Sequence, residues 1–274
     1  IMSKGKITQI IGAVVDVNFE KDLLGKRIIV TGASRGLGAK TCEVLAAKGA
    51  KIVMLSRSIK DMNILKRKLK NSKNHDCIQV DFLKEDQIEI AIDKAHKFLK
   101  QIDIVLHIAG GGYGLKDPLI KNQDINKLLQ INLLAAIEIN RIVVNNKKKN
   151  KNLKLVHVGS IASYEAAGSV GYNTVKSALA TYVRSLGREL YSNNVIVTGI
   201  LPGGFIAPGN AMQRFKSSNL EEYNKFIKNR LPRKFMGHMN EIIPMLLFLC
   251  SKHASMMGGC LVPIDAGEGK SYQT

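Results

Sequence analysis

The chain of 274 residues is long enough for one large domain, and its apolar runs are strand-sized rather than the ~20 residues of a membrane span. Its net charge of +19 attracts anions, but no aromatic platform accompanies the densest lysine run at 145–154, so we expect no nucleic-acid partner. The first residues show no secretory signal, and the four cysteines lack a C-x-x-C pair, so we expect a cytoplasmic protein that spans no membrane and holds no metal.

Residues 2–20, "MSKGKITQIIGAVVDVNFE", resemble the opening of an ATP synthase beta subunit. In those subunits such a segment begins a small β-barrel, but the rest of that barrel is missing here, and about eighteen residues cannot form one alone. We therefore expect residues 1–20 to be an extension outside the core fold, either a loose tail or an added edge strand. A non-enzymatic interaction module or subunit fragment is the function that this segment alone suggests.

After residue 20, short β-branched runs alternate with longer helical stretches, which is typical of βαβ units around a parallel sheet. The pattern predicts a doubly wound seven-stranded α/β sheet with helices on both faces, in one domain over 21–270. The expected strands are 27–31, 51–56, 77–80, 104–108, 154–158, 195–200 and 260–264, and the expected helices lie near 36–48, 60–70, 85–100, 124–145, 173–191 and 240–251. One long irregular connection, about 203–237, is predicted to be a substrate lid.

The stretch "IIVTGASRGLGAKT", residues 28–41, follows the first strand of this core and opens a helix. A triphosphate-binding P-loop needs a lysine directly after its last glycine, but Ala39 separates Gly38 from Lys40. The stretch instead fits T-G-x-x-x-G-x-G, in which Gly32 turns the chain, Gly36 admits a pyrophosphate and Gly38 packs closely. The helix N-terminus adds N–H donors for an anion. We interpret the loop as a dinucleotide site.

Residues at the ends of the next strands bear on the cofactor. Arg57 stands where an NAD-binding fold usually carries an acid for the ribose 2′-hydroxyl, and Arg35 lies within the glycine loop. Two guanidinium groups favour a 2′-phosphate, so NADP(H) is the preferred cofactor and NAD(H) the alternative. Asp81 ends the third strand, where its carboxylate could accept from the adenine amino group or cap the following helix.

A second group of residues carries the chemistry. In "YNTVK", Tyr172 and Lys176 are four residues apart, so a helix places them on one face. A neighbouring ammonium is expected to lower the tyrosine pKa from ~10 toward the range of general acid and base catalysis. Ser160 ends the preceding strand, twelve residues before Tyr172, where its hydroxyl could bind a substrate oxygen.

These motifs, in this order and spacing, resemble a short-chain dehydrogenase/reductase over residues 21–270. The match includes "TGASRGLG", "HIAGG" at 107–111, "INLLA", "VGS", "YNTVK", "LPGG" at 201–204 and "GGCLVPIDAG". The resemblance implies a Rossmann-type fold in which Tyr172 is the general acid or base, Lys176 holds the nicotinamide ribose, Ser160 positions the carbonyl and Asn132 helps to hold a water relay. It extends the expected cofactor contacts to Ser34, Leu37, Ala109, Gly110, Pro202 and Gly203, beside Gly32, Arg35, Gly36, Gly38, Arg57, Asp81, Tyr172 and Lys176.

The sequence departs from the family's pattern at two places. Where the family usually has N-N-A-G, this chain has His107-Ile108-Ala109-Gly110, and "GGFIAPG" after the penultimate strand lacks the threonine that often binds the nicotinamide carboxamide. Backbone groups around Phe205 and Ile206 are expected to substitute for it.

The expected function is hydride transfer between NADP(H) and a small-molecule carbonyl or alcohol. Two narrower hypotheses concern the substrate. One is a 3-oxoacyl-carrier-protein reductase, whose partner, an acyl carrier protein, is acidic. The other acts on a sugar or nucleotide-linked sugar, which the long lid with its mixed aromatic and arginine residues suits. The resemblance also implies a homodimer or homotetramer.

Overall fold

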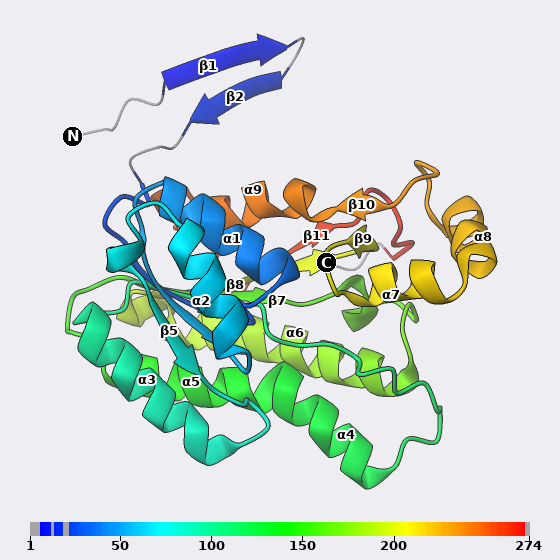
Figure 1. Cartoon of the computed structure of the whole chain (residues 1–274), viewed down its shortest axis with the longest axis horizontal. Coiled ribbons are helices and arrows are strands. Elements are labelled where there is room, and N and C mark those ends of the chain that lie inside the picture. The colour runs from blue at the N-terminus through cyan, green and yellow to red at the C-terminus, as the bar shows by residue number, and fades with distance from the viewer. Residues whose placement is uncertain (1–5, 12–13, 19–21, 272–274) are drawn as a thin grey trace.

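The core of this computed structural model is a parallel sheet of seven strands in the order β11-β8-β7-β6-β3-β4-β5. The structure describes residues 6–11, 14–18 and 22–271. The strands are β3 (Arg27–Thr31), β4 (Lys51–Ser56), β5 (Asp76–Gln79), β6 (Ile104–His107), β7 (Leu153–Val158), β8 (Val195–Pro202) and β11 (Leu261–Ile264). All seven lie where the sequence predicts strands, and the doubly wound α/β fold is confirmed (Figure 1).

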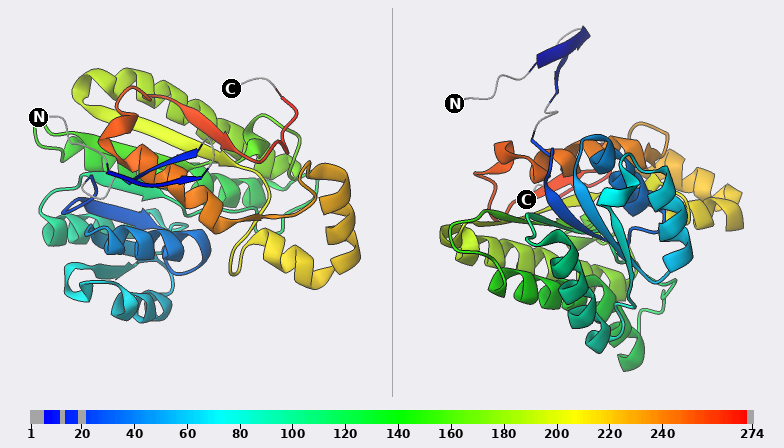
Figure 2. Two further views of the ribbon diagram at one scale, coloured as in Figure 1. Left: turned by 90° about the horizontal axis from the view of Figure 1, so that it is seen from above. Right: turned by 60° about the vertical axis from the view of Figure 1, so that its left-hand side comes forward.

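Helices cover both faces of the sheet, so its strands are apolar along their whole length. Along β3, for example, Ile29 packs with the helices of one face while Ile28 and Val30 pack on the other. Figure 2 shows the two layers from the side. One layer holds α3 (Glu85–Leu99), α5 (Ala135–Asn145) and α6 (Val170–Leu190), and the other holds α1 (Gly36–Ala47), α2 (Ile59–Lys68) and α9 (Met239–Cys250).

The helix expected over 124–145 is interrupted. It consists of α4 (Asn122–Leu129), a π-helical turn at Gln130–Leu134 and α5. By length and composition the stretch Asn122–Asn145 could cross a membrane, but a buried core helix passes the same test. Here Ile139, Ile142 and Val143 pack in the core against the sheet.

The connection at 203–237, expected to be irregular, is largely helical, so that prediction is wrong. It contains β9 (Phe205–Ile206), α7 (Ala211–Ser218) and α8 (Leu220–Arg230), and it returns through β10 (Gly237–His238), which pairs in parallel with β9. The Asn210 and Asn219 side chains cap the two helices by accepting from the backbone N–H groups of Gln213 and Glu222. Figure 1 shows α7 and α8 projecting from one end of the sheet.

The N-terminal strands do not join the core sheet. β1 (Lys6–Ile11) and β2 (Val14–Asn18) pair with each other in a separate antiparallel hairpin (Figure 1). The expectation of an added edge strand is therefore wrong. The rest of the segment 1–20, namely residues 1–5, 12–13 and 19–20, lies outside the described residues.

Candidate active site

The strand order reverses between β3 and β6, and parallel sheets of this type bind ligands in the crevice at that point. The glycine loop follows β3, and Ala109 and Gly110 follow β6, so both lie at the carboxyl edge where the crevice opens. The Thr31 hydroxyl joins the two strand ends by accepting from the N–H groups of Ile108 at 3.0 Å and Ala109 at 3.1 Å. This threonine fixes the floor of the crevice.

Close backbone approaches explain two of the glycines. Gly32 has a φ of +69°, and a Cβ there would lie 2.9 Å from the Ala109 backbone. A Cβ on Gly38 would lie 2.2 Å from the Gly32 carbonyl oxygen, so only glycine lets α1 begin this close to the strand end. The expected roles of Gly32 in the turn and Gly38 in close packing agree with this geometry. The first turn of α1 has no side-chain cap, and N–H groups of this kind are the donors that bind a phosphate.

The glycine loop also meets the beginning of the 203–237 segment. A Cβ on Gly36 would lie 3.0 Å from the Pro208 carbonyl oxygen, and the position of a Cβ on Gly209 is 3.1 Å from the Arg35 side chain. The start of the 203–237 segment therefore packs directly against the glycine loop.

Two exposed arginines lie near the glycine loop, one within it and one after the neighbouring strand β4. Arg35 precedes α1 and Arg57 follows β4, and within the described part of the chain neither guanidinium makes a hydrogen bond or an ion pair. The Ser56 hydroxyl donates to the Ser34 hydroxyl at 2.9 Å, which joins the end of β4 to the loop. Ser56 did not figure among the expected site residues, although its place at the strand end, next to Arg57, was the available signal.

Asp81 does not cap the helix that follows it. Its carboxylate accepts from the Leu83 N–H at 3.2 Å, whereas α3 starts after Lys84 without a side-chain cap. The capping alternative is wrong because the chain turns at Asp81, three residues too early.

The candidate catalytic residues meet on α6 and around the end of β7. Tyr172 and Lys176 lie one turn apart near the start of α6, and Ser160 follows β7. Lys176 is buried; its ammonium lies 5.7 Å from the centre of the Tyr172 ring and donates to the Val158 carbonyl oxygen at 3.1 Å. A Cβ on Gly110 would lie 3.5 Å from the same ammonium.

The electrostatics of the pair differ from the expectation. Burial raises the pKa of Tyr172, and a hydrogen bond with Ser160 only partly offsets this effect. Burial also lowers the pKa of Lys176 to about 8. The predicted lowering of the tyrosine pKa by Lys176 is therefore wrong for this structure, because the ammonium faces the ring and Val158 rather than the hydroxyl.

Asn132 sits in the π-helical turn, and its amide is held by protein groups. Its Nδ2 donates to the carbonyl oxygens of Leu128 and Gly111, both at 3.0 Å, and its Oδ1 accepts from the Gly111 N–H at 3.0 Å. A π-turn leaves backbone groups without their usual helical partners, and the side chain takes up one of these. These contacts brace the loop beside Lys176, and the role of Asn132 in a water relay stays a prediction.

Behind these residues, His107 and His157 lie opposite each other on the neighbouring strands β6 and β7. Their rings stack with centroids 4.3 Å apart, and Asn140 contacts both, with His107 Nε2 at 2.8 Å from its Oδ1. Burial lowers the pKa of His107 to about 4 and that of His157 well below its usual value. Both rings are therefore neutral at physiological pH, and they support the loop that starts at Ile108.

A family model described as "short chain dehydrogenase" matches residues 26–218, and the chain belongs to this family of oxidoreductases. It is 29% identical over 249 residues to a 3-oxoacyl-[acyl-carrier-protein] reductase of Buchnera aphidicola, covering 88% of this chain and 96% of that one. It is 28% identical to a 2-dehydro-3-deoxy-D-gluconate 5-dehydrogenase of Formosa agariphila, covering 90% and 93%. The matched range leaves residues 2–20 outside.

Solved structures of such proteins share the fold. L-sorbose reductase from Gluconobacter frateurii, complexed with NADPH and L-sorbose, superimposes with a TM-score of 0.83 at 22% identity, over 92% of this chain and 100% of that one. A 3-oxoacyl (acyl-carrier-protein) reductase from Agrobacterium tumefaciens with NADP bound gives 0.81 at 21% identity, over 91% and 97%. Both superpositions show that this chain shares the fold of those proteins.

Proposed function

We propose that this protein transfers hydride between NADP(H) and a carbonyl or alcohol substrate, with Tyr172 as general acid in reduction and general base in oxidation. The observation that supports this most is the convergence of Ser160, Tyr172 and Lys176 beside Gly110, at the edge of the crevice where the glycine loop lies. A bound nicotinamide cofactor would supply the hydride in reduction and accept it in oxidation.

The protein's own residues handle the proton and the orientation. The Ser160 hydroxyl positions the substrate oxygen, and Tyr172, which burial keeps protonated, donates its proton to that oxygen. Lys176 holds the ribose hydroxyls and stabilises the tyrosinate left after the transfer. Asn132 keeps the loop at Gly110 and Gly111 in place.

We infer a preference for NADP(H) from the two exposed guanidinium groups of Arg35 and Arg57. Neither guanidinium forms an ion pair with a carboxylate of the described chain. A 2′-phosphate is the anion that a dinucleotide would bring to this edge of the sheet. The Ser34 hydroxyl accepts from Ser56 and keeps its own proton as a further donor.

We propose that the segment 203–237 is the substrate lid. Its start packs on the glycine loop, and its helices α7 and α8 project beyond the sheet, as Figure 1 shows. Between residues 209 and 237 it carries seven basic residues and two acidic ones. This balance favours a substrate with an anionic group, either an acyl chain on an acidic carrier protein or a sugar acid or nucleotide-linked sugar.

A substrate panel tests the function and separates these classes. The reaction of NADPH with acetoacetyl thioesters, free and on acyl carrier protein, is compared with that of keto-sugar acids and nucleotide-sugar ketones. Turnover of one class, weakened by salt, supports the proposal. No turnover with any carbonyl, despite NADPH binding in a fluorescence titration, would contradict it. Assembly into homodimers or homotetramers stays a prediction that light scattering can measure.

A further inference from the structure

The residues after β11 form a short segment across the substrate side of the site, Asp265–Ser271, here called the C-terminal strap. The Asp265 carboxylate shapes it by accepting from the N–H groups of Gly267 at 3.0 Å and Gly269 at 2.9 Å. Ala266 and Gly267 both have positive φ, which turns the chain sharply away from the sheet. The strap is thus a loop that its own internal hydrogen bonds hold in shape.

Glu268 is the buried residue of the strap, with a side chain only 4% exposed. One carboxylate oxygen accepts from Arg230 Nε at 2.8 Å, and the other accepts from the Gly204 N–H at 2.5 Å. Arg230 is the last residue of α8, and Gly204 follows the Pro202-Gly203 turn at the end of β8. One carboxylate therefore joins the strap, the lid and the turn expected beside the nicotinamide.

The other end of the strap reaches the loop that carries Ser160. The Glu165 carboxylate accepts from the N–H groups of Lys270 at 2.6 Å and Ser271 at 2.5 Å. A Cβ on Gly269 would lie 3.3 Å from the Tyr164 hydroxyl. The strap consequently bridges the Ser160 loop and the lid, the two segments between which a substrate would lie.

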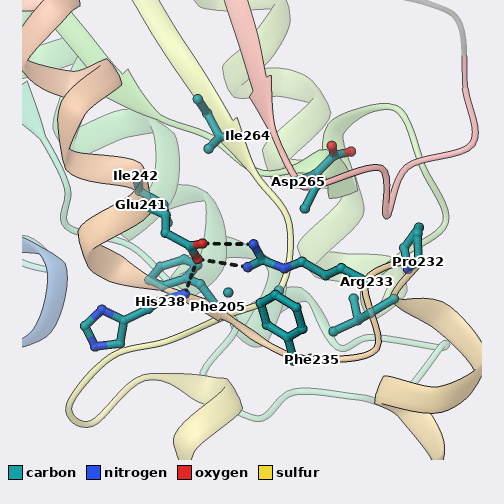
Figure 3. A pocket seen from close by; sticks show the side chains of 13 residues that line it. Phe205, Pro232, Arg233, Phe235, His238, Glu241, Ile242, Ile264 and Asp265 are labelled. Carbon is teal, nitrogen blue, oxygen red and sulfur yellow. Dashed lines mark hydrogen bonds and ion pairs between the residues drawn. The ribbon is translucent and has the colours of Figure 1, made fainter. Parts of the chain in front are cut away.

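A second ion pair holds the lid further along its return path. Arg233 donates to both oxygens of Glu241 at 2.9 Å. Figure 3 shows this pair across a pocket that both residues help to line, with the Phe235 ring against the guanidinium. The Arg233 and Glu241 side chains are 26% and 49% exposed, so water screens this pair more than the pair at Glu268. In the pair with Arg230 the carboxylate of Glu268 is buried, so that carboxylate is the less screened of the two.

We propose that Glu268 is a positioning residue that fixes the closed lid to the turn at Gly204, so that substrate binding and cofactor positioning depend on one carboxylate. This inference rests on the proposed function. The physical reason is that loss of the carboxylate leaves a buried N–H and a guanidinium without a partner, and charge-assisted hydrogen bonds of this kind are among the strongest in proteins. The Glu268 carboxylate thus holds the turn at Gly204 through a direct hydrogen bond to the backbone.

Three substitutions separate the two contacts of Glu268. In Glu268→Gln the amide oxygen still accepts from Gly204, but the ion pair to Arg230 is lost; Arg230→Gln removes the same pair from the other side. Glu268→Ala removes both contacts. Glu222→Gln, in an exposed pair with Lys225 on the same helix, is the matched control. Each variant is measured for substrate KM, for NADPH Kd by fluorescence and for hydrogen exchange of 203–230.

We expect Glu268→Gln and Arg230→Gln each to raise substrate KM about 10-fold with NADPH Kd nearly unchanged, and their combination to add little more. Glu268→Ala should also raise NADPH Kd about 10-fold. In all three, α8 should exchange faster, while the control resembles the wild type. Wild-type KM and exchange in Arg230→Gln, or additive effects in the double variant, would overturn the inference. Hydrogen exchange and NADPH binding need no turnover, so an inactive wild-type protein would count against the proposed function and leave this inference measurable.

Discussion

The ammonium of Lys176 lies over the ring of Tyr172, 5.7 Å from its centre, and donates its hydrogen bond to the Val158 carbonyl oxygen instead of the tyrosine hydroxyl. The ammonium therefore lies near the aromatic ring of Tyr172 but makes no hydrogen bond to its hydroxyl. Because burial raises the pKa of Tyr172, the resting protein holds the proton that reduction requires. The ammonium then acts chiefly on the tyrosinate that forms after the proton leaves.

The rate of reduction is predicted to depend on the charge of Lys176. Its pKa is lowered to about 8 by burial, so the ammonium is present below that pH and is lost as the pH rises through it. We expect kcat/KM for reduction to fall as the pH rises through about 8. A pH profile at saturating NADPH measures this effect. Lys176→Met should be slow at every pH, and a wild-type profile that is flat from about pH 7 to about pH 9 would show that the charge is not needed.

The cofactor preference is predicted to rest on Arg35 and Arg57. Replacing both by serine removes the two cations available to a 2′-phosphate, so NADPH Kd should rise at least about 10-fold while NADH Kd stays the same. Fluorescence titration with both cofactors measures the difference. Lys40→Ser is the matched control, because Lys40 pairs with Glu43 inside α1. Equal losses of affinity for NADPH and NADH would mean that the two arginines do not bind the 2′-phosphate.

The close approach at Gly38 predicts a large cost for any side chain. In Gly38→Ala the new Cβ would meet the Gly32 carbonyl oxygen at 2.2 Å, so either α1 or the glycine loop must shift. We expect the free energy of unfolding to drop by about 2 kcal/mol and NADPH binding to weaken. Urea unfolding measures the first effect. Ala47→Ser on the exposed side of α1 should change stability by less than about 0.5 kcal/mol.

Much of this fold follows from local sequence pattern. The seven strands are continuous apolar runs such as 28–30, because both faces of a parallel sheet are buried, and this pattern separates them clearly from the helices. The lid helices carried a signal of their own. Asn210 and Asn219 each precede a Gln or Glu by three residues, which is a spacing typical of helix starts. This spacing predicts helices in the segment that was expected to be irregular.

Other features depend on contacts that no local pattern specifies. The anchoring role of Glu268 needs Gly204, which lies 64 residues away in the chain. The amide of Asn132 in the π-turn is held by Gly111, 21 residues earlier in the chain. The stacking of His107 on His157 joins neighbouring strands 50 positions apart. The raised pKa of Tyr172 does not follow from the sequence, because helix spacing places Lys176 nearby but does not say which atoms its ammonium faces.

The buried histidines predict a loss of stability in acid. Their pKa values are lowered in the folded state, that of His107 to about 4, so below the unfolded value of ~6.5 the unfolded chain binds more protons. The contribution of the neutral rings is complete above about pH 6.5 and is lost as the pH falls toward 4. Urea unfolding across this range should show the decline, and His107→Asn should make it shallower. The same slope in His107→Asn and the wild type would contradict this assignment.

Single-turnover reduction with preloaded NADPH tests most directly whether Tyr172 is the proton donor. We predict that Tyr172→Phe binds NADPH with wild-type affinity, because the hydroxyl does not carry the cradle, and that hydride transfer slows by at least about 100-fold. Wild-type hydride transfer in Tyr172→Phe, with NADPH bound normally, would contradict the account.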